Sequence, residues 1–285
     1  MCGLAGGISS FLSLPERDVI KDLIWLNMYR GTHSTGMFDY VEDTKKLKKP
    51  YKENSLYWKT TQHPFNFVMD ICDKVETERW KEGMPSVIAA HTRHATIGKI
   101  TRPNAHPFNH KNIIGMHNGT ILGNFKNREK FETDSEALYY NIANLGFEEA
   151  IEEVQNFSPA YALVWMDTAE NKVHFYRNEK RPLHFAMMGG STAYWSSEKI
   201  TLDFVLSQHN MKPSKVEAFE TETLYTVDMN KPGLDIAKKV FRPKKWYATT
   251  SYTSTAIGAR SAITPGSGIG TSRTYRPTDD RTSSE

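Results

Sequence analysis

Apolar positions along this 285-residue chain repeat with two different periods. Short apolar runs rich in β-branched and aromatic residues predict strands, whereas apolar positions spaced three and four apart predict helices. We therefore expect strands at residues 2–9, 36–41, 86–92, 112–117, 160–166, 172–177, 183–188, 192–196, 214–219 and 223–228. Helices are expected at residues 15–29, 64–81, 133–145, 148–155 and 199–208. Strands dominate and the helices fall into two groups, which favours sheets covered by helices in an α+β domain.

The end of the chain differs in composition from the rest. Residues 241–285 are rich in Ser, Thr and Gly and carry seven Lys/Arg against three Asp/Glu. Such a segment buries too little apolar surface to offset its ordering entropy, so we expect a disordered basic tail there. Residues 2–240 are then expected to form one folded domain. The charges of this domain nearly balance, and they give no indication of a nucleic-acid partner.

Composition argues against several classes of protein. No apolar run approaches the ~18 residues of a membrane-spanning helix, so no membrane association is expected. Cys2 and Cys72 are the only cysteines, which excludes a disulfide scaffold and an all-cysteine zinc site. The first residues lack the basic stretch and the apolar core of a secretory signal. A reducing, cytoplasmic location is the resulting expectation.

Candidate chemistry begins at Cys2, which directly follows the initiator methionine. A lone cysteine is usually a small buried hydrophobe, so position 2 alone is a weak signal. If the methionine is removed, however, the thiol and a free α-amine belong to one residue. An α-amine has a pKa of about 7.7–8.0, which suits a general base at neutral pH. Nucleophile and base would then be assembled in one residue, the arrangement of N-terminal-nucleophile catalysis.

Other residues have two interpretations each. Asn118 and Gly119 follow an apolar strand and form either an Asn-Gly turn or an oxyanion hole, made by the Asn118 amide and the Gly119 N–H. Arg93 ends another strand, where it makes a surface salt bridge or clamps a carboxylate. Asp134 caps a helix, pairs with a substrate ammonium, or does both. A cationic and an anionic clamp beside a thiol describe a pocket for a free amino acid.

Histidines are concentrated in one stretch of the chain: His91, His94, His106, His110 and His117. The pairs spaced three and four apart would serve zinc only on a helix, and these stretches are expected to be strands or loops. No cysteine or acidic residue accompanies them. We therefore expect structural histidines and no metal site.

Taken together, these residues resemble the glutaminase domain of class II glutamine amidotransferases, which are N-terminal-nucleophile hydrolases. Six motifs occur in the family's order: Met-Cys-Gly-Leu-Ala-Gly at 1–6, Arg-Gly-Thr-His-Ser-Thr-Gly at 30–36, His-Thr-Arg-His-Ala-Thr-Ile-Gly at 91–98, Asn-Ala-His-Pro at 104–107, His-Asn-Gly at 117–119 and Thr-Asp-Ser-Glu at 133–136. Further matches at 175–178, 182–183 and 196–198 extend the likeness over roughly residues 2–230. It is closest to the branch that contains the fructose-6-phosphate amidotransferases.

The resemblance implies a four-layer αββα sandwich of the N-terminal-nucleophile hydrolase type. It implies L-glutamine as ammonia donor, a glutamyl-thioester on Cys2, and no cofactor. Asn118 and Gly119 are the implied oxyanion hole. The resemblance also implies that Arg93 and Thr96 bind the glutamine carboxylate, and that Asp134 and Gly119 bind its amino group. It places Arg30 in the loop that orders Cys2.

This sequence departs from the family pattern at three positions near the expected site. His94 replaces the usual tryptophan, Ile97 an often-present histidine, and His33 the aspartate of the arginine loop. No acceptor domain is recognisable after about residue 240, so we expect a separate synthetase-like protein to receive the ammonia. Two alternatives stay open. One is a free-standing N-terminal-nucleophile amidohydrolase that acts on a small or γ-glutamyl amide, and the other is a catalytically silent binding module.

Overall fold

Two antiparallel sheets form the centre of the computed structural model, which describes residues 1–42, 53–84 and 86–244. The seven-stranded sheet has the order β11-β9-β10-β1-β4-β2-β3. Its strands are β1 (Gly3–Ser9), β2 (Ser34–Val41), β3 (Ser55–Thr60), β4 (Ser86–Arg93), β9 (His184–Met188), β10 (Thr192–Ser196) and β11 (Lys215–Ala218). The six-stranded sheet has the order β13-β12-β8-β7-β6-β5. Its strands are β5 (Phe108–His110), β6 (Ile113–Thr120), β7 (Ala160–Asp167), β8 (Lys172–Arg177), β12 (Thr223–Asp228) and β13 (Ile236–Val240).

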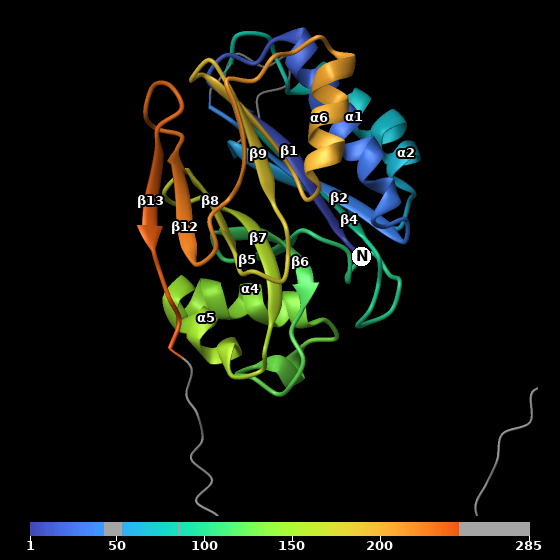
Figure 1. Cartoon of the computed structure of the whole chain (residues 1–285). Helices are drawn as coiled ribbons and strands as arrows, with labels where there is room; N and C mark the ends of the chain where they lie inside the picture. The colour runs from blue at the N-terminus through green and yellow to red at the C-terminus, as the bar shows by residue number, and fades with distance from the viewer. Residues whose placement is uncertain (43–52, 85, 245–285) are drawn as a thin grey trace, which may run out of the picture. The chain divides into compact units, whose positions relative to one another are not determined.

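Helices cover the outer face of each sheet (Figure 1). Over the seven-stranded sheet lie α1 (Leu14–Leu26), α2 (Pro64–Phe67), the π-helical turn η3 (Val68–Cys72), α3 (Asp73–Glu78) and α6 (Lys199–Gln208). Over the six-stranded sheet lie α4 (Asp134–Leu145) and α5 (Phe147–Gln155). Two 3₁₀ turns, η1 (Asn27–Tyr29) and η4 (Arg128–Lys130), complete the described elements.

Three apolar cores separate these layers. Because side chains alternate along a strand, β2 sends Met37 toward the helices and Phe38 toward the opposite sheet. The core between the helices and the seven-stranded sheet contains Leu23 of α1 and Met37. The core between the two sheets contains Phe38 and Val164 of β7. The third core lies between β7 and helices α4 and α5. The expected four-layer αββα fold is therefore confirmed.

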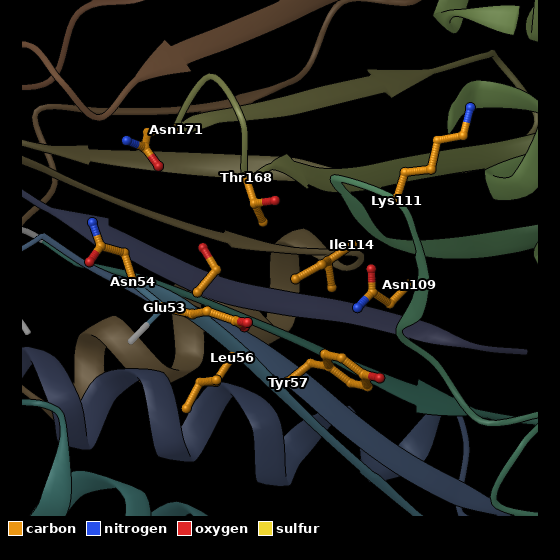
Figure 2. A pocket seen from close by; sticks show the side chains of 10 residues that line it. Glu53, Asn54, Leu56, Tyr57, Asn109, Lys111, Ile114, Thr168 and Asn171 are labelled. Carbon is orange, nitrogen blue, oxygen red and sulfur yellow. The ribbon is translucent and has the colours of Figure 1, made fainter. Parts of the chain in front are cut away.

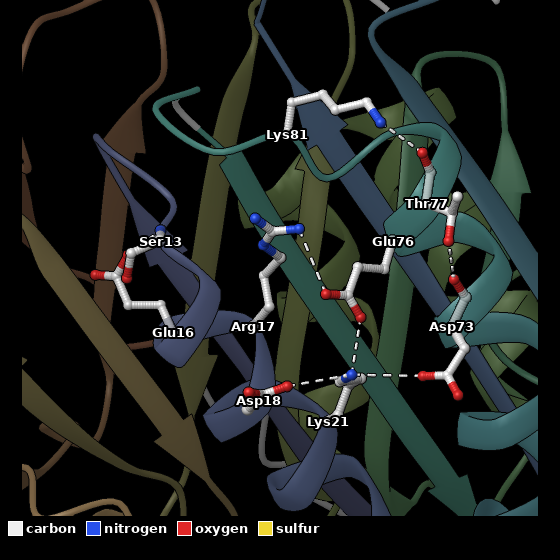
Figure 3. A network of polar contacts seen from close by, with 9 residues as sticks. All are labelled: Ser13, Glu16, Arg17, Asp18, Lys21, Asp73, Glu76, Thr77 and Lys81. Atoms are coloured by element: carbon white, nitrogen blue, oxygen red, sulfur yellow. Dashed lines mark hydrogen bonds and ion pairs between the residues drawn. The ribbon is translucent and has the colours of Figure 1, made fainter. Parts of the chain in front are cut away.

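A polar network ties α1 to α3 on the outer side of the helical layer (Figure 3). Lys21 Nζ lies 2.8 Å from a Glu76 carboxylate oxygen and 3.4 Å from one of Asp73. Arg17 reaches the other Glu76 oxygen at 3.4 Å. Arg17 is buried, whereas Lys21, Asp73 and Glu76 are partly exposed, so the contacts of Lys21 orient the two helices while contributing little to stability.

Several expectations from the sequence are wrong in detail. The expected helical segment 64–81 is helical from Pro64 to Glu78, with the π turn η3 between α2 and α3, so it ends three residues earlier than expected. Strands β3, β5 and β13 were not expected. β3, β5 and β13 occupy edges of their sheets, and most of their residues are only partly buried, so they lack the apolar runs that mark interior strands.

Most of the expected tail, residues 245–285, lies outside the described part, so its disorder and the domain boundary at 240 stay predictions. At the start of the expected tail, Phe241 packs against the core beneath α4 and α5, and its N–H donates to the Glu222 carbonyl oxygen at 2.8 Å. Across the described residues, no helix is both long enough and apolar enough to cross a membrane.

Candidate functional site

Cys2 directly precedes β1, the central strand of the seven-stranded sheet. Arg30, which follows the 3₁₀ turn η1, donates from Nε to the Cys2 carbonyl oxygen at 2.6 Å. The Arg30 guanidinium also forms an ion pair with Glu198 at the start of α6. Arg30 is nearly buried, and its ion pair with Glu198 holds it against the Cys2 backbone. This contact agrees with the ordering role that the motif implied for Arg30.

The thiol of Cys2 lies against the backbone of His94. The His94 N–H donates to Cys2 Sγ at 3.4 Å, and Sγ lies 3.5 Å from the His94 carbonyl oxygen. Burial raises the pKa of the Cys2 thiol, while the His94 N–H, the terminal ammonium and Arg93 oppose that rise. The thiol is thus predominantly protonated at neutral pH and needs a base before it can attack a carbonyl.

Arg93 is buried and braces the loop that follows β4. Its guanidinium donates to the carbonyl oxygens of Ile97 at 2.7 Å and Lys99 at 3.0 Å. The surface-salt-bridge interpretation does not fit this geometry. Thr96 lies exposed within the braced loop. Arg93 therefore holds Thr96 and its neighbours in place, and the charge of Arg93 is close enough to lower the pKa of Cys2.

Asn118 and Gly119 belong to β6 and do not form a turn. They pair with Ala162 and Tyr161 of β7, so the turn interpretation is wrong. Asn118 Nδ2 donates to Ser197 Oγ at 3.2 Å, and the same oxygen accepts the Leu4 N–H at 2.9 Å. Ser197 thus connects the Asn118 amide to the strand that carries Cys2.

Gly119 has no room for a side chain. A Cβ atom there would lie 1.8 Å from the Ala160 carbonyl oxygen and 2.4 Å from His117 Nε2. The position therefore requires glycine for steric reasons, whether or not its N–H acts on a substrate.

Asp134 is the first residue of α4, and Thr133 is the N-cap. The Thr133 hydroxyl accepts the Glu136 N–H at 3.3 Å, which is the capping contact. Asp134 is nearly buried, and its Oδ2 accepts the Ile121 N–H at 2.7 Å. The carboxylate is near enough to Cys2 to raise the thiol pKa. Asp134 thus places a negative charge near the Cys2 thiol without serving as the cap.

Buried histidines lie on β4 and β6, and the His117 side chain is directed toward α4. His117 contacts Ser135 Oγ through Nδ1 at 2.9 Å and the Ala160 carbonyl through Nε2 at 3.1 Å. His91 Nε2 lies 3.1 Å from the His117 carbonyl, and burial lowers the pKa of His91 to about 3. These histidines are neutral and structural. Among the described residues, no group of three or more His, Cys, Asp or Glu side chains is arranged to hold a metal ion.

Two contributors to this site had no assigned role in the sequence analysis, Ser197 and Glu198. They follow β10 and belong to the matched segment 196–198, which is the only local signal for them. Each acts through a long-range contact, with Asn118 and Arg30 respectively. Pattern along the chain does not reveal such pairings.

A polar cavity of about 560 Å³ lies elsewhere, between the edges of the two sheets (Figure 2). Its lining includes Asn54, Ser55, Asn109, Lys111 and Thr168. The strand register places the cavity far from Cys2. Ser55 pairs with Tyr40 at one end of β2, whereas Ser34, at the other end of β2, pairs with Arg93 near Cys2. The cavity holds no nucleophile from the motifs, so the Cys2 region remains the candidate active site.

Comparison with curated proteins finds relatives of one kind. The chain is 27% identical over 201 residues to glutamine–fructose-6-phosphate aminotransferase from Lactococcus lactis, with 64% of this chain and 30% of the relative covered. It is 32% identical over 131 residues to the enzyme of the same name from Buchnera aphidicola, with 44% and 17% covered. The chain spans less than a third of the length of these relatives. No protein-family model matches it.

Solved structures with the same fold include two enzymes. Glutamine phosphoribosylpyrophosphate amidotransferase from B. subtilis aligns over 86% of this chain and 50% of its own, with a TM-score of 0.56 and 17% identity. A structure described as the allosteric regulatory enzyme of purine biosynthesis aligns over the same shares, with a TM-score of 0.56 and 20% identity. The relatives and the fold are those of class II glutamine amidotransferases, which confirms the resemblance that the motifs indicated.

Proposed function

We propose that this chain hydrolyses L-glutamine to glutamate and ammonia, with Cys2 as the nucleophile, and that the ammonia is transferred to an acceptor. One observation carries the proposal: a buried cation at the end of β4, Arg93, and a buried anion at the start of α4, Asp134, both lie close enough to the Cys2 thiol to act on its pKa. An α-amino acid carries the two complementary charges. The curated relatives are named glutamine–fructose-6-phosphate aminotransferases, and these names support glutamine as the substrate.

The proposed reaction uses the groups around Cys2 in two steps. After removal of Met1, the α-amine of Cys2 takes the thiol proton, and the thiolate attacks the side-chain carbonyl carbon of glutamine. Asn118 and Gly119 donate to the oxygen as it becomes negative. The carbon–nitrogen bond then breaks, and ammonia leaves with the proton from the α-amine. Water hydrolyses the resulting thioester, which releases glutamate and restores the thiol.

Arg93→Ala is expected chiefly to raise the KM for glutamine. The guanidinium binds the glutamine carboxylate equally in the ground state and the transition state, so its loss weakens binding more than turnover. Steady-state ammonia release at varied glutamine concentration measures the split. Because Arg93 also braces the carbonyls of Ile97 and Lys99, Arg93→Lys is the matched control that retains a cation there. A fall in kcat at unchanged KM would contradict the assigned role.

Asn118→Ala is expected to lower kcat by roughly a hundredfold or more, because it removes a donor that acts on the oxyanion. The KM should change little, since the ground-state carbonyl needs that donor less. Ser197→Ala is the matched control, because Ser197 contacts the Asn118 amide at 3.2 Å and the Leu4 N–H at 2.9 Å and therefore acts only by positioning. Its effect on kcat should be the smaller one. Equal loss in KM and kcat for Asn118→Ala would assign this residue to substrate binding instead.

The proposed acceptor is a separate synthetase-like protein. Free ammonia is mostly protonated at pH 7, and ammonium is a poor nucleophile, so direct transfer avoids this loss. Ammonia release should rise when the partner and its acceptor are present. If the chain alone hydrolyses glutamine at about 10 s⁻¹ or faster, the free-standing amidohydrolase replaces this proposal. If neither glutamine nor other small or γ-glutamyl amides are hydrolysed, the silent binding module replaces it.

A further inference from the structure

We infer that His33 is a positioning residue for the Cys2 nucleophile and acts by fixing the backbone of His94. The inference rests on the proposed function for its catalytic meaning, although its geometry stands independently. The structure places His33 and His94, two of the three departures from the family pattern, in direct contact. Their rings stack with centroids 4.7 Å apart and planes inclined by 24°.

The backbone of His94 is not held by the sheet. The strand β4 ends at Arg93, whose pairing with Ser34 is the last of the β2–β4 register. His94 therefore begins a loop. Both of its backbone polar groups nevertheless face the thiol of Cys2, with the N–H at 3.4 Å and the carbonyl oxygen at 3.5 Å. Another group must keep this peptide in place.

His33 supplies contacts on both sides of His94. Its backbone N–H donates to the Arg93 carbonyl at 3.0 Å, and its Nδ1 accepts the Ala95 N–H at 3.0 Å. Nδ1 is therefore unprotonated in this arrangement. The ring stack adds a third contact between the same two segments. Together they bracket the single residue that borders the nucleophile.

Close approach of the two loops depends on Gly31. A Cβ atom at this position would lie 2.4 Å from the Arg93 carbonyl carbon and 2.6 Å from the His94 nitrogen. The absence of a side chain lets the chain from Arg30 to His33 lie directly against residues 93–95. Two residues of this short segment therefore act on Cys2. Arg30 donates to the Cys2 carbonyl oxygen, and His33 contacts the residues on both sides of His94, whose N–H donates to the Cys2 thiol.

Positioning by His33 has a chemical consequence at the thiol. The His94 N–H favours the thiolate and lowers the pKa of Cys2 against the effect of burial. If the peptide moves away, the thiolate loses this donor and becomes scarcer at neutral pH. Four other charged groups act on the thiol and are not in contact with the His33 side chain: the terminal ammonium, Arg30, Arg93 and Asp134. The exposed ring of His94 does respond to His33, since His33 helps to lower the pKa of His94.

The test is the pH dependence of Cys2 alkylation by iodoacetamide in the full chain, followed by mass spectrometry of the peptide that contains Cys2. His33→Phe keeps an aromatic ring but has no acceptor for the Ala95 N–H. His33→Asn places an amide oxygen close to the position of Nδ1 and lacks the ring. Both variants remove an imidazole, so the comparison isolates the acceptor.

We expect the alkylation midpoint of His33→Phe to lie roughly one pH unit above that of the wild type. The midpoint of His33→Asn should remain close to the wild-type value, because the oxygen replaces the acceptor. In the glutamine assay, His33→Phe should lower kcat more than it changes KM. A midpoint of His33→Phe equal to that of the wild type, with both proteins folded by circular dichroism, would overturn the inference.

A second variant covers the case in which the phenylalanine ring prevents folding. His33→Ala fits the space that the imidazole leaves and removes both side-chain contacts, so it should show the same upward shift. An unshifted His33→Ala would equally refute positioning. Failure of the proposed function is a separate result, because iodoacetamide requires no glutamine recognition. A wild-type chain inert toward glutamine would still report whether His33 sets the thiol midpoint.

Discussion

Cys2→Ala is expected to reduce ammonia release from glutamine by roughly 10⁴-fold or more, because the variant retains the pocket but has no nucleophile. Cys2→Ser should be nearly as impaired, since a hydroxyl is a far weaker nucleophile at the same base. Neither change should affect folding, because Cys2 precedes β1 and contributes only the thiol contacts with His94. Ammonia release at saturating glutamine is the measurement.

Cys72 provides the matched control, as the second cysteine of the chain. It lies in the η3 turn, fully buried, with its Sγ 3.8 Å from Met37 Sδ. Burial raises the pKa of its thiol, so it is inert toward electrophiles. Cys72→Ala should keep the wild-type kcat, and a glutamine-like electrophile should label Cys2 alone. Labelling of Cys72 with loss of activity would reassign the nucleophile.

The layered fold was predictable because most of its strands are interior strands. The stretches that became β1, β4, β6 and β7 are short, apolar and buried, so hydrophobic pattern alone marks them. β13 runs Ile-Ala-Lys-Lys-Val and is mostly exposed, because it pairs on one side only, with β12. Its stability comes from a neighbour distant in sequence, and no local signal records that neighbour.

In the candidate site, too, the local features are predictable from the sequence and the long-range contacts are not. Cys2, Arg93, Asn118 and Asp134 stand in recognisable motifs at the ends of elements, so the sequence indicates them one by one. The contacts that organise them are long-range. The Ser197 bridge to Asn118 joins residues 79 positions apart, and the stacking of His33 on His94 joins two departures from the family pattern. Neither contact has a periodicity from which it could be deduced.

The same limitation applies to the most deeply buried ion pair of the fold. Asp39 lies on the face of β2 that points toward the helices, and its side chain is wholly buried. Arg79, immediately after α3, donates from Nε and Nη2 to the two carboxylate oxygens, each at 2.8 Å. The Trp80 indole N–H donates to Oδ2 at 3.1 Å and the Leu56 N–H to Oδ1 at 3.3 Å. One carboxylate thus connects β2, β3 and the end of α3.

Asp39→Ala is therefore expected to lower the free energy of unfolding by about 3–5 kcal/mol, because it removes a fully buried carboxylate that accepts hydrogen bonds from Arg79, Trp80 and Leu56. The matched control is Glu76→Gln in the network between α1 and α3 (Figure 3), where Lys21 and Glu76 are each partly exposed. Water replaces a lost contact there, so the cost should be at most about 1 kcal/mol.

Urea denaturation followed by circular dichroism gives both values, and a double variant separates the two explanations for a large loss. In Asp39→Ala/Arg79→Met both charges of the buried pair are removed and apolar volume replaces the cation, so much of the stability should return. If the double variant is as unstable as Asp39→Ala, the loss comes from the bonds to Trp80 and Leu56, and these hold β2 and β3 against α3. If Asp39→Ala lowers the free energy of unfolding no more than Glu76→Gln does, then water reaches the Asp39–Arg79 pair, and the helical layer does not exclude solvent from this face of β2.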